Sequence, residues 1–157
     1  MYIERNAMRN RREMEQFDRL LLTNKVEWTA IPFQGLLKHL QSRDTVPAII
    51  TVQVEPGHQG RHVIIDGNNR AVAHAYLKRP VRYFPILSAK DIDAILEIEA
   101  RGGFSGFPHR PFLKGDASYK KLVQDAIMAA AHGMNGCTAQ QKADEFRREK
   151  KRGNVRQ

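Results

Sequence analysis

The feature that most constrains the fold is an abrupt change of pattern within residues 62–75, His-Val-Ile-Ile-Asp-Gly-Asn-Asn-Arg-Ala-Val-Ala-His-Ala. The β-branched run 63–65 predicts a short buried strand, and residues 66–68 are of types that favour a tight turn. From Asn69 onward the alanine-rich sequence predicts a helix that ends before Pro80. A strand therefore turns sharply into a helix, with a glycine at the corner.

This predicted corner has the chemistry of a phosphate-binding site. The first backbone N–H groups of a helix lack intrahelical acceptors and lie at the positive end of the helix dipole. Arg70 adds a fixed positive charge in the first turn, and we expect Asp66 to hold the turn or a metal. The predicted phosphate- or nucleotide-binding residues are Gly67, Asn68, Asn69, Arg70 and His74. The alternative is a structural corner in which Asp66 caps the helix.

The corner also carries a resemblance to a known family. Residues 66–70, Asp-Gly-Asn-Asn-Arg, lie between a hydrophobic strand and an alanine-rich helix, and they resemble the DG-N/H-H-R signature of the ParB/sulfiredoxin superfamily. A predicted strand over residues 81–86 also fits that family, and the resemblance covers residues 26–100. It implies a ParB/sulfiredoxin-like fold that binds ATP or another NTP at the corner, with Mg²⁺ as a candidate metal.

The family includes several activities, and the residues of this chain bear on each. Sulfiredoxin chemistry is excluded because Asn68 stands where those proteins have a cysteine. ParB-type relatives act on or at DNA, some as nucleases or NTPases, which would make this chain a hydrolase with Asp66 and Arg70 as catalytic residues. Asn69 stands where a histidine often precedes the arginine, and this weakens a mechanism that needs an acid or base there.

Two alternatives to a nuclease or NTPase follow from the same resemblance. One is a small-molecule kinase that uses ATP or ADP; its only nearby candidate base is Glu27, which we interpret as a solvent-facing residue. The other is a DNA-binding or regulatory module without enzymatic activity. A base close to Arg70 would favour the kinase, and its absence from the sequence pattern favours a binding protein or a weak hydrolase.

Charge favours an anionic partner. The chain has 26 Lys and Arg against 17 Asp and Glu, a net charge of +9, so nucleotide and DNA are the expected partners. The residues expected to contact nucleic acid are Lys78, Arg79, Arg82, Arg110, Arg147, Arg148, Lys150, Lys151 and Arg152. The single cysteine excludes an intrachain disulfide. Without a long apolar run or a signal-peptide core, we expect a cytoplasmic protein that does not contact membranes.

Periodicity along the chain predicts an α/β (α+β) fold, a small mixed sheet flanked by helices. Before the corner we expect a helix over 4–22, a strand over 25–31, a helix over 34–41 and a hairpin of strands over 47–54 and 61–65. After it we expect helices that begin near Ser88, Asp116 and Thr138. The chain then divides into an N-terminal basic helix (1–25), a ParB/sulfiredoxin-like domain (26–115) and two C-terminal helices with a basic tail (116–157).

Three features each admit two interpretations. His58 and His62, with Asp66, could mark a metal site, but strand spacing separates His62 from Asp66, so we interpret both histidines as exposed. The aromatic loop 104–112 either covers an edge of the core or closes over a base as a lid. The charged last helix either docks through Phe146 or frays into a basic tail.

Overall fold

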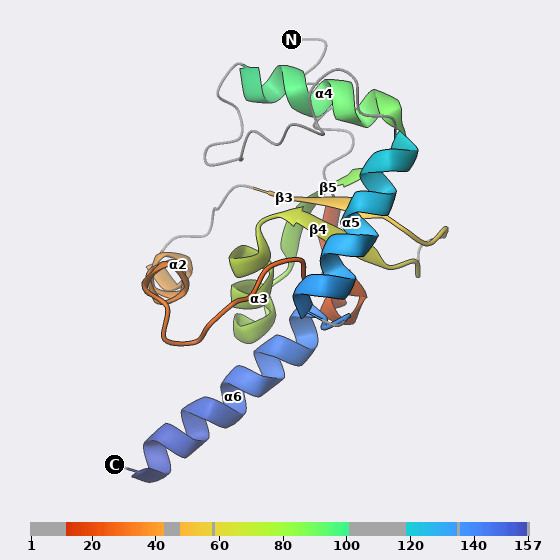
Figure 1. Cartoon of the computed structure of the whole chain (residues 1–157). Helices are drawn as coiled ribbons and strands as arrows, with labels where there is room; N and C mark the ends of the chain where they lie inside the picture. Colours follow the sequence, from red (N-terminus) through yellow and green to blue (C-terminus); the bar gives the residue numbers. More distant parts are fainter. Residues whose placement is uncertain (1–11, 43–47, 58, 101–118, 135, 157) are drawn as a thin grey trace.

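In the part of the chain that the structure describes, five strands form one mixed sheet in the order β1-β5-β3-β4-β2. Figure 1 labels three of them, β3, β4 and β5. The computed structural model describes residues 12–42, 48–57, 59–100, 119–134 and 136–156. Within these residues the strands are β1 (Arg12–Met14), β2 (Leu20–Leu21), β3 (Ile49–Gln53), β4 (His62–Asp66) and β5 (Val81–Ile86). β3 pairs antiparallel with β4 and parallel with β5, whereas β1 pairs antiparallel with β5 and β2 parallel with β4. The predicted α/β class, the predicted hairpin and the predicted strand over 81–86 are confirmed.

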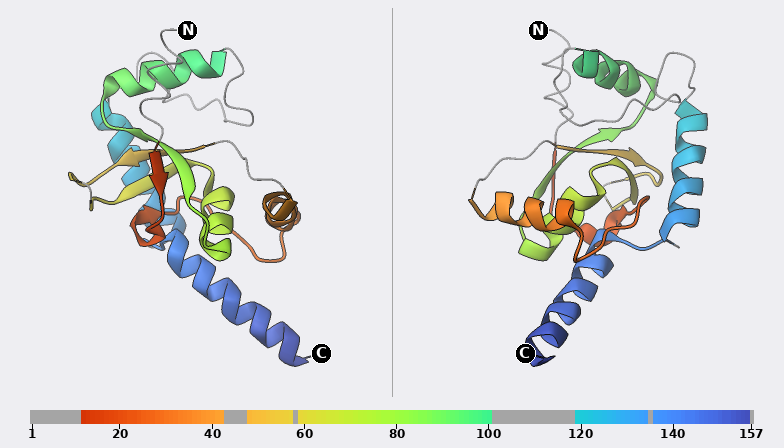
Figure 2. Two further views of the ribbon diagram at one scale, coloured as in Figure 1. Left: turned by 180° about the vertical axis from the view of Figure 1, so that it is seen from behind. Right: turned by 60° about the vertical axis from the view of Figure 1, so that its left-hand side comes forward.

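Helices cover both faces of this sheet (Figure 2). In the described residues they are α2 (Ile31–Ser42), α3 (Asn68–Leu77), α4 (Ala89–Ala100), α5 (Tyr119–Met134) and α6 (Ala139–Arg156), with a short 3-10 turn, η1 (Phe17–Arg19). Because side chains alternate along a strand, Ile49 of β3 packs with α2, α3 and α6, while Ile50 packs with α4 and α5. The core is therefore divided into two clusters by the sheet.

The link between the two edge strands shows that the sheet is curled. β1 and β2 lie at opposite edges, yet only residues 15–19 connect them. A flat sheet of this size would separate its edges by about 19 Å, whereas a link that contains a 3-10 turn spans about 17 Å. The edges therefore approach each other, and because Phe17 of this link packs in the core cluster of α3, they do so on the face that carries α3.

The predicted helix over residues 4–22 is wrong from Arg12 onward, because this stretch contains β1, η1 and β2 instead. Met14 and Phe17, two of the residues whose spacing predicted the helix, are buried in one core cluster, whereas Leu21, a third, belongs to the cluster on the other face of the sheet. Pairing of β1 with β5 and of β2 with β4 buries Met14 and Leu21 without a helix, and Phe17 is buried from the 3-10 turn between these strands. Long-range strand pairing thus outweighs local helical periodicity here.

The predicted strand over residues 25–31 is also wrong. The stretch is irregular, and α2 begins at Ile31, earlier than expected, with Pro32 in its first turn, where a missing N–H is tolerated. Trp28 packs its ring against Tyr76 and Phe33, with ring centroids 5.2 Å and 5.9 Å away. The apolar residues of this loop therefore serve the core from an irregular backbone.

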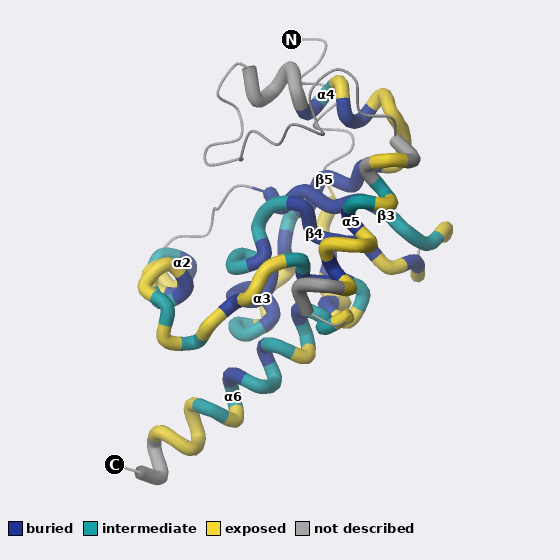
Figure 3. The backbone as a smooth tube through the Cα atoms, in the orientation of Figure 1, coloured by how far each residue is buried: buried dark blue, intermediate teal, exposed yellow. Residues whose placement is uncertain are grey.

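The last helix docks on the domain through Phe146, as one of the two interpretations predicted. Ala139, Ala143 and Phe146 are buried on one side of α6, and the Phe146 ring lies 5.0 Å from that of Phe33. The predicted cap is confirmed, because the Thr138 hydroxyl accepts a hydrogen bond from the Gln141 N–H at 3.1 Å. Beyond Phe146 the helix projects from the domain and becomes exposed (Figures 1 and 3).

Some predicted features lie outside the described residues: residues 4–11, His58, the loop 104–112 with Arg110, and the cap Asp116. None of the described helices combines the length and the apolar character that a membrane span requires.

Candidate functional site

The corner between β4 and α3 is a single residue, Gly67. β4 ends at Asp66 and α3 begins at Asn68. Gly67 has φ +103°, a left-handed conformation that residues with a side chain rarely adopt. A Cβ at this position would lie 2.5 Å from Cγ2 of Ile49, so the close approach of β3 also requires glycine. The predicted sharp corner is therefore present, and its shape depends on Gly67.

Arg70 is held against the end of the strand. Its Nη2 donates to Oδ2 of Asp66 at 2.9 Å, and its Nη1 donates to the carbonyl oxygen of Ala48 at 3.4 Å. The two side chains of the ion pair are only 14% (Arg70) and 18% (Asp66) exposed. A partly buried ion pair of this kind fixes the guanidinium in one place more firmly than an exposed pair would. Asp66 therefore orients Arg70.

The two asparagines of the corner differ in their surroundings. Asn68 is buried, and its Oδ1 accepts from the N–H of Thr23 at 2.9 Å while its Nδ2 donates to the Thr23 hydroxyl at 3.1 Å. Its side chain therefore ties the loop before α2 to the corner, and only its backbone N–H belongs to the first turn of α3. Asn69 is half-buried at the start of the helix. The first turn of α3 contains no acidic residue.

His74 lies one turn beyond Arg70, in the core rather than at the corner. It is buried, and burial is the main cause that lowers its pKa from the ordinary value. The polar backbone of Arg79 and Pro80 acts in the opposite direction. Within the described residues, however, neither ring nitrogen meets a hydrogen-bond partner at bonding geometry. His74 therefore supports α3 from inside, and its ring is not placed to contact a ligand at the corner.

Two of the arginines predicted to bind nucleic acid make internal contacts at helix ends. Arg147 on α6 donates from Nη2 to the carbonyl oxygens of Ala75 and Tyr76, at 2.8 Å and 2.9 Å, in the last turn of α3. Arg79 donates to the carbonyl oxygen of Leu40 at the end of α2. Both arginines donate to carbonyls in the last turn of a helix; at Ala75 the guanidinium is a second donor, because this carbonyl also accepts the Lys78 N–H at 3.2 Å.

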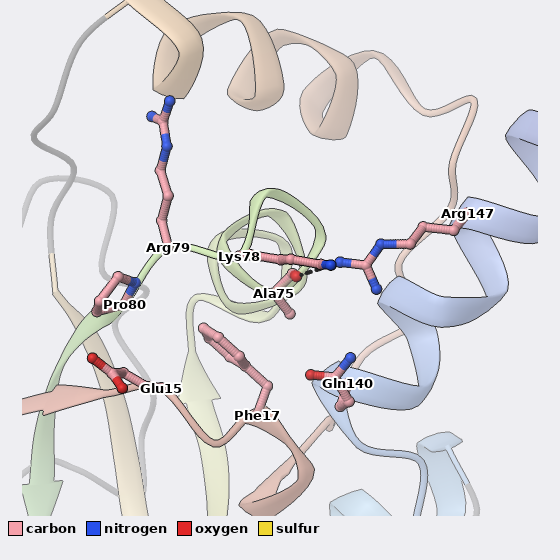
Figure 4. Close-up of a pocket in the computed structure, with 8 residues that line it drawn as sticks. All are labelled: Glu15, Phe17, Ala75, Lys78, Arg79, Pro80, Gln140 and Arg147. Atoms are coloured by element: carbon pink, nitrogen blue, oxygen red, sulfur yellow. Dashed lines mark hydrogen bonds between the residues drawn. The ribbon is translucent and has the colours of Figure 1, made fainter.

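Lys78 lies between these arginines at the end of α3, in the left-handed conformation. Together with Arg79 and Arg147 it lines a cavity of about 400 Å³ against η1 and α6. Figure 4 shows Lys78 directed toward Arg147, while Arg79 points away from both, toward α2. The structure thus gathers three predicted basic residues around one cavity, but two of their guanidinium groups hold helices together.

The remaining predicted nucleic-acid contacts fall into two groups. Arg82 is half-buried on β5. The other four described residues are exposed on the projecting end of α6: Arg148, Lys150, Lys151 and Arg152. These four side chains form what we call the α6 basic end. Lys78 and Arg79 are also exposed, but the α6 basic end holds the four exposed predicted cations that lie together on one helix.

The described residues offer no ready metal centre. They contain no group of three or more His, Cys, Asp or Glu side chains that could hold an ion. His62 is not the exposed histidine that we predicted: only 6% of it is exposed, because within β4 its ring packs against the Tyr83 ring and the Thr51 hydroxyl. The candidate kinase base Glu27 lies in the loop before α2 and pairs with Lys25 at 3.1 Å on the surface.

No family model, curated protein or solved structure matches this chain. The resemblance to the ParB/sulfiredoxin superfamily therefore rests on the motif at residues 66–70 and stays a prediction.

Sequence reasoning missed the partners that shape the corner. Thr23 holds Asn68 from 45 residues away, and the backbone carbonyl of Ala48 holds Arg70. No local pattern marks either residue, because both contacts arise from the packing of β3 and the α2 loop around β4. The ion pair between Asp66 and Arg70 does have a local signal, since residues four apart at a helix start lie on one side.

Proposed function

We propose that the β4–α3 corner binds a phosphate group of a nucleotide, in a protein that acts on or at DNA. The observation that carries this proposal is the start of α3. Gly67 turns β4 directly into the helix, the first turn has no acidic residue, and a positioned guanidinium lies beside it. An uncapped helix N-terminus with an adjacent arginine favours a bound anion.

Each residue of the corner has its own role in the proposed site. The backbone N–H groups of Asn68, Asn69 and Arg70 face the anion at the helix start, and the Arg70 side chain pairs with its charge. Asp66 keeps the guanidinium in place, because its carboxylate is already within 2.9 Å of Arg70. Gly67 permits close approach of the ligand, since no side chain stands at the corner.

Mg²⁺ fits this site only together with the ligand. Asp66 is the one carboxylate of the corner, and the described residues contain no larger cluster of metal-binding side chains. A magnesium ion is commonly held by one or two carboxylates together with substrate phosphates, so Asp66 would share it with the nucleotide. When bound, the ion would neutralise phosphate charge. Hydrolysis is the further part of the proposal: Arg70 would contact the phosphates directly, and Asp66 would reach them through the shared ion.

DNA binding is proposed for a different surface, the α6 basic end. Four exposed cations on a helix that projects from the domain can follow a phosphate backbone without reading bases (Figure 3). The small-molecule kinase receives less support, because its candidate base Glu27 forms a surface ion pair with Lys25.

The test of the corner is nucleotide affinity of the full chain, measured by calorimetry with ATP in the presence and absence of Mg²⁺. Arg70→Ala should weaken binding by roughly ten- to a hundredfold, because it removes a charge-assisted pair. Arg70→Lys should recover only part of this loss, because an ammonium group cannot reproduce the fork.

Arg61→Ala is the matched control, because it breaks the ion pair with Glu55 at the opposite end of β4. It should leave ATP affinity unchanged. Unfolding curves of each variant separate a lost contact from a lost fold. Unchanged ATP affinity in a folded Arg70→Ala protein would show that the corner is structural and that the assignment is wrong.

The DNA surface has its own test. Replacement of the four cations of the α6 basic end by glutamine should weaken binding to duplex DNA and flatten its salt dependence by about one in the log–log slope per lost phosphate contact. The domain should stay folded, since all four residues are exposed. Equal affinity and an equal slope in the variant would remove α6 from the interface.

A further inference from the structure

Four neighbouring strands bring polar side chains onto one face of the sheet, beyond the part that α3 covers. Arg12 of β1 stands opposite Tyr83 of β5, and Gln53 of β3 stands opposite His62 of β4. Arg12 lies two residues before Met14, which packs in the same cluster as Tyr83, so the alternation along β1 places it on this face. These residues line a cavity of about 230 Å³.

His62 enters this cavity in a fixed orientation. The ring is buried, and its Nδ1 lies 3.0 Å from the hydroxyl of Thr51, which is fully buried. Within the described residues this is the only hydrogen bond of the Thr51 hydroxyl, so its hydrogen is satisfied only if Nδ1 accepts it. The proton of the neutral imidazole therefore lies on Nε2. His62 therefore offers the cavity an N–H donor.

The charge state of His62 supports this role. Burial, followed by the nearby charges of Arg12 and Arg19, lowers its pKa from 6.5 to about 4. The ring is therefore neutral at neutral pH, and one tautomer suits the contact with Thr51.

Tyr83 supplies a second neutral donor. Its ring meets that of His62 edge-on, with centroids 5.4 Å apart, and only 9% of the residue is exposed. A mostly buried tyrosine usually finds a partner for its hydroxyl, and among the described residues the Tyr83 oxygen is not one of the side-chain atoms shut off from solvent without a partner. The cavity that it lines is where such a partner would bind.

Arg12 brings a positive charge to this cavity, and no negative side chain among the described lining residues offsets it. Arg12 is exposed and forms no ion pair with the described residues. No acidic side chain is among the described residues that line the cavity. An arginine beside two neutral donors and no carboxylate matches the needs of an oxyanion, which accepts several hydrogen bonds and carries one or two negative charges.

We propose that this cavity binds the oxyanion group of a small molecule, a carboxylate or a phosphate, through Arg12, His62 and Tyr83. Its volume lies below the range of pockets that enclose drug-sized ligands, so the ligand is small or inserts only its charged group. The site is separate from the corner, because His62 begins β4 and Asp66 ends it. It would therefore be a second ligand site beyond the proposed function.

The test is an NMR titration of the full chain in which the imidazole signals of His62 are followed. Inorganic phosphate and acetate are the two probes, with chloride at matched ionic strength as the reference for general screening. We expect a saturable change of the His62 signals with at least one probe, and a rise of the His62 pKa when the anion is bound. The probe that acts shows whether the group is a phosphate or a carboxylate.

Variants connect the response to the named residues. Arg12→Gln should weaken binding by about tenfold or more, and Tyr83→Phe by a few-fold, because they remove a charged and a neutral donor respectively. Lys25→Gln is the matched control, since it also removes one positive charge but does not line the cavity. It should bind as the unchanged protein does.

The inference is overturned if neither probe produces a change beyond that of chloride, or if Arg12→Gln responds as fully as the unchanged chain. Arg70→Ala should keep the His62 response. Weakened ATP binding with an intact anion response in this variant would show that the two sites are independent, so that either proposal can fail without the other.

Discussion

Acid should destabilise this protein through one buried histidine, His62. In the folded protein its pKa is about 4, against 6.5 as the ordinary value, because burial and two arginines disfavour the charged ring. Above pH 6.5 both the folded and the unfolded state hold a neutral ring, so His62 contributes no pH dependence. As pH falls from 6.5 toward 4, the unfolded state binds more protons and stability is lost.

The size of this loss of stability follows from the gap between the two pKa values of His62, 6.5 and about 4. Each pH unit within it removes about 1.4 kcal/mol of unfolding free energy. At pH 5 the protein lies about one and a half units inside the window, so His62 alone should cost about 2 kcal/mol relative to pH 7. That is a large fraction of the stability of a domain of this size.

Urea unfolding at pH 7 and pH 5 measures this loss, with His62→Gln as the comparison. His74 is present in both proteins, so its own contribution cancels in the difference. The variant should lose about 2 kcal/mol less between the two pH values than the unchanged chain. An equal loss in both proteins would refute the reasoning. If the variant does not fold, an NMR pKa of His62 near its ordinary value in the unchanged chain would refute it equally.

The remaining predictions concern the corner and the core. Gly67→Val should lower the unfolding free energy by about 2 kcal/mol or more in urea titrations, because the left-handed backbone and Ile49 both oppose a side chain; an unchanged midpoint would contradict this. His74→Leu should leave stability equal or raise it, since it removes two buried nitrogens without partners within the described residues; a lower melting temperature would contradict this. Phe146→Ala should cost about 3–5 kcal/mol and alter the fluorescence of Trp28, whose ring lies 5.5 Å away; a native spectrum and stability would contradict it.

The parts of the fold that sequence could predict have strong local signals. The corner at Gly67, the hairpin before it and the capped α6 each combine a periodic apolar pattern with a turn or capping residue. The sequence indicated less clearly how far α6 packs into the core. Phe146 is one large residue in a charged helix, yet its ring joins those of Trp28 and Phe33.

The parts that failed depend on partners far away in sequence. Met14, Phe17 and Leu21 have a spacing that suits a helix. Met14 and Leu21 instead pair as strands with the edges of β5 and β4, and Phe17 lies in η1 between them. His62 follows a polar turn, and for this reason it was predicted to lie on the surface. The face of the sheet on which it lies is set instead by its register with Gln53. Neither the strand edge that a segment will pair with nor the register of that pairing can be predicted from residues nearby in sequence.

In the candidate site, too, features set by local sequence could be predicted, and features set by distant residues could not. Arg70 could be identified as a cation in the first turn of a helix, because that position is local. Its fixed orientation could not, since it depends on the carbonyl of Ala48, 22 residues away. In the same way, Asn68 turned inward to Thr23 because the α2 loop lies beside the corner.

The central claim, that the start of α3 binds a nucleotide phosphate, is tested most directly by the backbone amide signals of Asn68, Asn69 and Arg70 during titration with ATP. These N–H groups are the proposed donors, so their NMR signals should move in a saturable way, and further than those of Lys150 and Lys151 on α6. Arg70→Ala should shift the midpoint to higher ATP concentration. Saturable binding with no change at the three corner amides would contradict the account.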